Sequence, residues 1–201
     1  MKTVLFRNDA RSFLLSALLG VMSGLLVIAL SFVTTEDGLL PYFSSSTFCV
    51  WFFTCSLIAL LSDDNGTAGY HTAVYVMCLI TVPCIISLFQ CVLQRENPLH
   101  YLRRELIWCL LLAVLAAVMC YALAFILNFG RMHNVLGVII RFLPAVIIAL
   151  DEASCIRIML TDHRHIATTV MQGLCLIAYI VILVILQIKK PAQIFGQKAT
   201  I

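Results

Sequence analysis

Charged side chains are scarce in this sequence. Only 11% of its 201 residues are Asp, Glu, Lys or Arg, whereas soluble globular domains carry about 25%. A water-soluble fold of this size could not cover its surface with so few charges beside so much Leu, Ile and Val. This scarcity excludes a soluble enzyme, a nucleic-acid-binding module and a disordered tail.

An excess of one charge sign is also missing. The chain has 13 Lys and Arg against 10 Asp and Glu, a net charge of +3, which is too mild to indicate a polyanionic partner. The sequence contains no P-loop, Rossmann fingerprint, HExxH or CxxC motif. We therefore expect no cofactor and no nucleic-acid partner.

Apolar residues, in contrast, form long continuous runs. Hydrophobic residues make up 62% of the chain, and its mean hydropathy is +1.04. A bilayer core about 30 Å thick is crossed by roughly 20 helical residues, whereas barrel strands would alternate in polarity. We expect an all-α, polytopic membrane helix bundle that forms a single domain over residues 1–201. Six runs are candidate spans, at about 12–33, 44–62, 72–93, 105–128, 134–150 and 166–188.

Basic residues flank the first and last runs. Lys2, Arg7 and Arg11 precede the first, and Lys189 and Lys190 follow the last. Since cytoplasmic loops are enriched in Lys and Arg, we expect both termini to be cytoplasmic and the protein to lie in the cell membrane. The first run is too long for a signal peptide and no A-x-A site follows it, so we interpret it as a retained span.

A polar linker at 94–104, QRENPLHYLRR, divides the runs into three plus three. Duplicated halves with an odd number of spans would be inverted repeats, as in many transporters. The two halves show no recurrence, so the sequence permits this arrangement without supporting it.

Small residues recur every four positions in the first run, at Ser16, Gly20 and Gly24. Such a face lets another helix approach closely, which matters because lipid provides no hydrophobic drive for helix association. We expect a packing seam here, within the chain or in a dimer, and favour the internal contact.

Arg141 lies inside the fifth run. A charge at that depth costs roughly 3 kcal/mol on insertion scales unless it is paired or faces water. Asp151 and Glu152 are about 15 Å further along a helix, so its partner must come from another span or from lipid headgroups. Arg141 is either a snorkelling side chain or, in the sharper hypothesis, the residue that binds an anion or substrate in a cavity. Pro83 and Pro144 are expected to kink the third and fifth spans.

The polar segment 151–166 includes His163 and His165 near carboxylates. Their spacing matches no specific metal site, and we expect a hydrated loop of mixed charge at the membrane interface. Eight of the nine cysteines lie in apolar runs, with Cys155 the exception. Buried cysteine packs as a small hydrophobe, so we predict packing residues without disulfides.

Residues 63–78, DDNGTAGYHTAVYVMC, combine a histidine at a membrane boundary with a cysteine. His71 and Cys78 would share one helix face about 10.5 Å apart, whereas a base and a nucleophile need roughly 3 Å. A working pair therefore requires a non-helical segment from Gly66 to His71, which Gly66 and Gly69 would permit.

The stretch GYHTAVYVMC resembles the accessory gene regulator B-type membrane endopeptidases, in which a Gly-x-His motif precedes the nucleophilic cysteine by seven residues. The resemblance implies that His71 is the base and Cys78 the nucleophile, acting on a signalling propeptide. Asp63 and Asp64 stand where that family has basic residues.

A broader pattern covers Trp51-Phe52-Phe53, residues 57–62 and the Tyr75-bearing third run. It resembles small bacterial multi-pass membrane proteins of unassigned function, and it implies no catalytic residue.

Three functions follow as hypotheses. The leading one is non-enzymatic small-solute transport, or a role as a membrane subunit of a complex. The alternatives are a Cys/His membrane endopeptidase and a structural or accessory helix bundle. Expected partners are the lipid bilayer and either other membrane subunits or a second copy of the chain.

Overall fold

The computed structural model describes residues 5–34, 45–94, 98–131, 135–162 and 166–188, and over these ranges the chain is almost entirely helical. The all-α helix bundle expected from the sequence is confirmed. Its elements are α1 (Ala10–Thr34), α2 (Ser45–Leu61), α3 (Asn65–Gln94), α4 (Pro98–Asn128), the short 3-10 helix η2 (Phe129–Arg131), α5 (Val135–Asp162) and α6 (Ile166–Ile188).

Three stretches of the described residues are long and apolar enough to cross a membrane: Ala10–Ala29, Asn65–Phe89 and Arg103–Arg131. Shorter apolar stretches lie in α2 and α6, at Val50–Leu61 and Gln172–Ile185. Large apolar side chains also cover the outer face of α4, where a soluble protein would place polar ones. These features identify a membrane protein, and the total of six spans stays a prediction.

Two expected loops are helical instead. α4 begins at Pro98, so most of the polar linker 94–104 belongs to its first turns, where proline is tolerated because no backbone donor is needed. α5 continues to Asp162, so the described part of segment 151–166 is a helix and the expected hydrated loop is wrong there. Helical backbone satisfies its own hydrogen bonds, which allows a helix to extend beyond the apolar run that predicted it.

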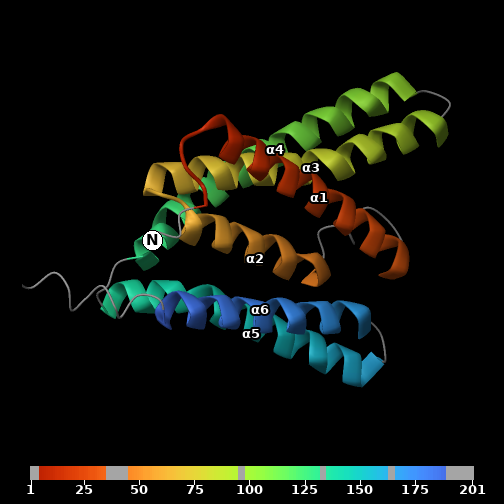
Figure 1. Ribbon diagram of the computed structural model, residues 1–201. Helices are drawn as coiled ribbons and strands as arrows, with labels where there is room; N and C mark the ends of the chain where they lie inside the picture. Colours follow the sequence, from red (N-terminus) through yellow and green to blue (C-terminus); the bar gives the residue numbers. More distant parts are fainter. Residues whose placement is uncertain (1–4, 35–44, 95–97, 132–134, 163–165, 189–201) are drawn as a thin grey trace, which may run out of the picture.

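The helices form two groups joined by α2 (Figure 1). α3 packs against both α1 and α4, and α5 packs against α6. α2 contacts α3 and α4 on one side and α5 and α6 on the other. The centre of the molecule is therefore the space around α2.

Glycines bring α1 and α3 into close contact. A Cβ atom at Gly20 would lie 2.7 Å from Cys78 Cβ, and one at Gly24 would lie 2.9 Å from the Leu79 carbonyl oxygen. Any larger side chain would force the two helices apart. The small-residue face of α1 thus lies inside the molecule, against α3.

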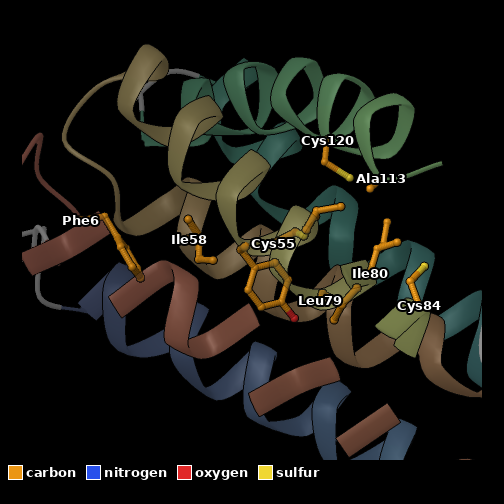
Figure 2. Close-up of a cluster of buried hydrophobic side chains, with 10 residues drawn as sticks. Phe6, Cys55, Ile58, Leu79, Ile80, Cys84, Ala113 and Cys120 are labelled. Carbon is orange, nitrogen blue, oxygen red and sulfur yellow. The ribbon is translucent and has the colours of Figure 1, made fainter. Parts of the chain in front are cut away.

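The main core cluster surrounds Tyr75 of α3, whose side chain is fully buried (Figure 2). Phe6 enters this cluster from the segment before α1 and is 2% exposed. The cluster therefore ties the start of the chain to the middle of the bundle. Its other buried members are Cys55, Ile58, Val76, Leu79, Ile80, Cys84, Ala113 and Cys120.

Backbone hydrogen bonds hold the segment before α1 in place. The Leu5 amide donates to the Leu61 carbonyl at 3.0 Å, and the Asp63 amide donates to the Phe6 carbonyl at 3.0 Å. Phe6 and Ser62 form a parallel bridge, so the N-terminal segment lies along the α2–α3 connection. We call residues 5–9 the N-terminal strap.

Aspartates cap the two helices that start at this end. Asp9 accepts the Ser12 amide at 2.7 Å before α1, and Asp64 accepts the Thr67 amide at 2.8 Å and its hydroxyl at 2.7 Å before α3. Carboxylates stabilise helix N-termini by satisfying free amides. The hydrogen bonds from Thr67 hold the pKa of Asp64 below its usual range.

Candidate functional site

His71 lies on the first turns of α3 and is 3% exposed. Its Nε2 donates to the Arg7 carbonyl at 3.0 Å, and its Nδ1 lies 2.9 Å from Ser16 Oγ. The rings of Phe6 and Phe13 flank the imidazole at centroid distances of 5.5 and 6.3 Å. Both ring nitrogens are thus engaged in holding the N-terminal strap and α1 against α3.

The structure does not bring His71 and Cys78 together. Asn65–Gln94 is one continuous helix, so the non-helical segment that the catalytic pair requires is absent, and the two residues lie two turns apart. Two turns of helix correspond to about 10.5 Å, well beyond hydrogen-bond reach. Gly66 and Gly69 are accommodated within the helix, and Gly69 provides room for the Tyr121 ring.

Arg141 finds its partner at the end of α4. Its Nε and Nη2 both donate to the Gly130 carbonyl, at 2.9 and 2.7 Å, and the residue is 4% exposed. Carbonyls at a helix C-terminus lack intrahelical donors and carry the negative end of the helix dipole. The end of the helix therefore stabilises the buried guanidinium.

Similar contacts close the end of α2. Asn128 Nδ2 donates to the Ala59 carbonyl at 2.6 Å, and the Arg131 guanidinium donates to the carbonyls of Ser62 and Asp63. Each of these side chains satisfies backbone acceptors that would otherwise be unpaired in an apolar region. Together with Arg141, they link α2, α4 and α5 at the end of α2 that also holds the N-terminal strap.

Two carboxylates of α5 lie against α6. Gln172, which is fully buried, donates from Nε2 to Asp151 Oδ2 at 2.5 Å. Glu152 lies beside Gly173, where a Cβ would be 3.3 Å from Glu152 Oε1. Within the described residues, Glu152 Oε2 is buried and accepts no hydrogen bond. We call Asp151, Glu152 and Gln172 the acidic pair site.

The acidic pair site lies where the apolar stretch of α6 begins, because Gln172 is the first residue of Gln172–Ile185. Gln172 is six residues from the start of α6, about 9 Å along the helix. Ionisable groups next to apolar spans are costly and mark ion or proton pathways in membrane proteins. No group of three or more potential metal ligands occurs among the described residues.

Sequence reasoning missed several of these residues. Gln172, Tyr179 and Asn128 are polar residues inside apolar runs, and that placement was the available signal. Tyr179 is fully buried and its hydroxyl donates to the Arg141 carbonyl at 3.3 Å. His163 and His165, considered as metal ligands, lie outside the described residues.

Two cavities flank Trp51 of α2. One, of about 190 Å³, lies towards Val27 and Pro83. The other, of about 220 Å³, lies between α2, α3 and α4 and is lined by apolar side chains, by Thr72 and by two cysteines, Cys55 and Cys120. Neither cavity includes Arg141, the residue expected to bind substrate.

Comparison with known proteins adds no relative from which a function could be transferred. Neither a family model, nor a curated protein, nor a solved structure matches this chain. Functional inference therefore depends on the geometry of its own residues.

Proposed function

We propose that this protein is a multi-pass membrane protein that transports a small cationic solute or a proton along the α5–α6 helix pair. The observation that carries the proposal is the acidic pair site, where Asp151 binds fully buried Gln172 and Glu152 lies beside Gly173 between two helices. A carboxylate there can accept a proton or a cation and release it again, because both acidic residues are half-buried and keep access to the surface.

The position of Arg141 supports this assignment. Arg141 precedes Asp151 by ten residues, about 15 Å along α5, and its Nε and Nη2 donate to the Gly130 carbonyl. At that separation it cannot neutralise either carboxylate by direct contact. The negative charge of the acidic pair is therefore to be balanced by a bound cation or by protonation. Arg141 stabilises the fold through its contact with Gly130.

The two alternative functions receive less support. A Cys/His endopeptidase needs His71 and Cys78 in contact, and a continuous helix separates them. An accessory bundle that recruits a partner through Ser16, Gly20 and Gly24 needs that face free, and α3 covers it.

Proteoliposomes provide the test. Full-length protein is reconstituted into phosphatidylcholine vesicles, and dissipation of imposed H⁺, Na⁺ and K⁺ gradients is followed with entrapped fluorescent dyes. We expect the wild type to dissipate at least one of these gradients and the Asp151→Asn/Glu152→Gln double variant to lose that activity about tenfold or more, because the charged acceptors are gone.

Glu105→Gln is the matched control. Glu105 belongs to α4, outside the acidic pair site, and lies 3.4 Å from Arg104 in an exposed ion pair. This variant should transport like the wild type. Transport by the α5–α6 pair is excluded if wild-type vesicles are no leakier than empty ones for all three ions, or if the double variant retains full activity.

A further inference from the structure

Two pairs of cysteine thiols lie in contact at the helix interfaces of α4. Cys55 of α2 contacts Cys120, and Cys84 of α3 contacts Cys109. All four are free thiols in the structure, and Cys55 and Cys120 are only 7% and 8% exposed. Thiols in contact across two helices can be joined by oxidation, provided that an oxidant can reach them.

A cavity distinguishes the Cys55–Cys120 pair from the second cysteine pair. Both line the cavity of about 220 Å³, whereas Cys84 and Cys109 lie outside its lining. Trp51 and Phe52 also line this cavity and add aromatic surface to it. Figure 2 shows Cys55 and Cys120 within the core cluster.

The volume of the cavity suits a single ring. Apolar protein cavities of about 150 Å³ stay dry and bind benzene, so a cavity of about 220 Å³ has room for a substituted six-membered ring. Met119 and Leu123 of the lining are 59% and 49% exposed on the outer face of α4. Entry from the lipid side is therefore open to an apolar molecule, while burial shields both thiols from oxidants dissolved in water.

We infer that Cys55 and Cys120 form a dithiol site that reduces a membrane quinone bound in this cavity. The two S–H bonds break and one S–S bond forms, so that the cysteine pair is oxidised by two electrons. Both electrons and both protons pass to the quinone, whose two carbonyl oxygens become the hydroxyls of the quinol. This activity is separate from the proposed transport and uses different helices.

A single-turnover reaction tests the inference. Reduced full-length protein in detergent, freed of reductant, is mixed anaerobically with decylubiquinone, and quinol formation is followed by ultraviolet absorbance. Remaining thiols are then alkylated under denaturing conditions, and peptides are mapped by mass spectrometry. We expect one equivalent of quinol and a Cys55–Cys120 disulfide, and oxidised glutathione should react about tenfold more slowly because it cannot enter the cavity.

Variants separate this site from the other thiols. Cys55→Ala and Cys120→Ala should abolish quinol formation, while Cys84→Ala and Cys109→Ala should leave it unchanged. Ala116→Leu, which fills part of the cavity, should slow the reaction with quinone more than that with oxidised glutathione. Circular dichroism confirms that each variant remains helical.

The inference is overturned if no quinol forms, if quinol forms equally in the Cys55→Ala variant, or if oxidised glutathione oxidises the cysteine pair as fast as the quinone does. Because the reaction needs neither vesicles nor an ion gradient, its outcome does not depend on whether the protein transports ions.

Discussion

Two buried polar side chains in this protein bind backbone carbonyls near helix ends. Arg141 binds the carbonyl of Gly130, and Asn128 binds that of Ala59. Burying an unpaired carbonyl or an unpaired guanidinium in an apolar environment costs free energy. A hydrogen bond between the two groups removes both penalties. A charged residue inside an apolar run can therefore be structural through its contacts with backbone carbonyls.

Replacing Arg141 tests this interpretation. Arg141→Ala should lower the free energy of unfolding by about 2–3 kcal/mol, because two charge-assisted hydrogen bonds to Gly130 are lost. Arg141→Lys should lose less, since one ammonium can still donate to the carbonyl. Unfolding is measured by titration with sodium dodecyl sulfate in mixed micelles, followed by circular dichroism.

Arg104→Ala is the control for this pair of variants. Arg104 is exposed and pairs with neighbouring Glu105, and exposed ion pairs contribute only about 0–1 kcal/mol. If Arg141→Ala is as stable as Arg104→Ala, a structural role for Arg141 is contradicted, and the hypothesis that Arg141 binds a substrate is favoured.

At the scale of helices, the contact between α1 and α3 depends on the absence of side chains. Gly20 and Gly24 leave room for the backbone and side chains of α3, while Ser16 joins the two helices through His71. Close backbone approach increases the van der Waals contact that drives association between helices in lipid. The four-residue spacing in the sequence reflects this geometry.

Enlarging one of these glycines should separate the two helices. Gly20→Leu is expected to cost at least about 2 kcal/mol, because the added atoms overlap Tyr75 and Cys78 of α3. Ala29→Leu, on an exposed position of the same helix, should change stability little. Both variants are compared by the same detergent titration, and equal stabilities would contradict the packing role of Gly20.

At the scale of the whole molecule, the N-terminal strap closes the bundle on one face. It bonds to the α2–α3 connection through backbone groups, accepts a hydrogen bond from His71 and inserts Phe6 into the core. Contacts between the start of the chain and residues near 62 and 71 connect α1 to the rest of the fold. The residue expected to be a catalytic base thus stabilises this connection.

Removing the Phe6 side chain should loosen this connection. Phe6→Ala is expected to lower the free energy of unfolding by about 3 kcal/mol or more, as is usual for a buried phenylalanine. Hydrogen exchange should also quicken at the amides of residues 61–63. Leu5→Ala is the control because Leu5 is 56% exposed, and identical behaviour of the two variants would exclude an anchoring role for Phe6.

Residence in a membrane and the all-α fold followed from the sequence by itself. Both depend on local properties, namely the apolarity of a run and its length relative to a bilayer, and these can be evaluated one segment at a time. The sequence predicted the ends of the helices less well. α4 and α5 extend through polar segments that were expected to be loops, because helical hydrogen bonding does not stop where hydrophobicity does.

The partners of the buried polar residues were decided only by the tertiary structure. His71 is paired with Ser16 and Arg7, Arg141 with Gly130, and Asp151 with Gln172. Each pair joins residues between 11 and 64 positions apart, and no spacing rule within one helix predicts such contacts. Which helices become neighbours depends on packing over the whole bundle, and that packing also created the cavity beside Cys55 and Cys120.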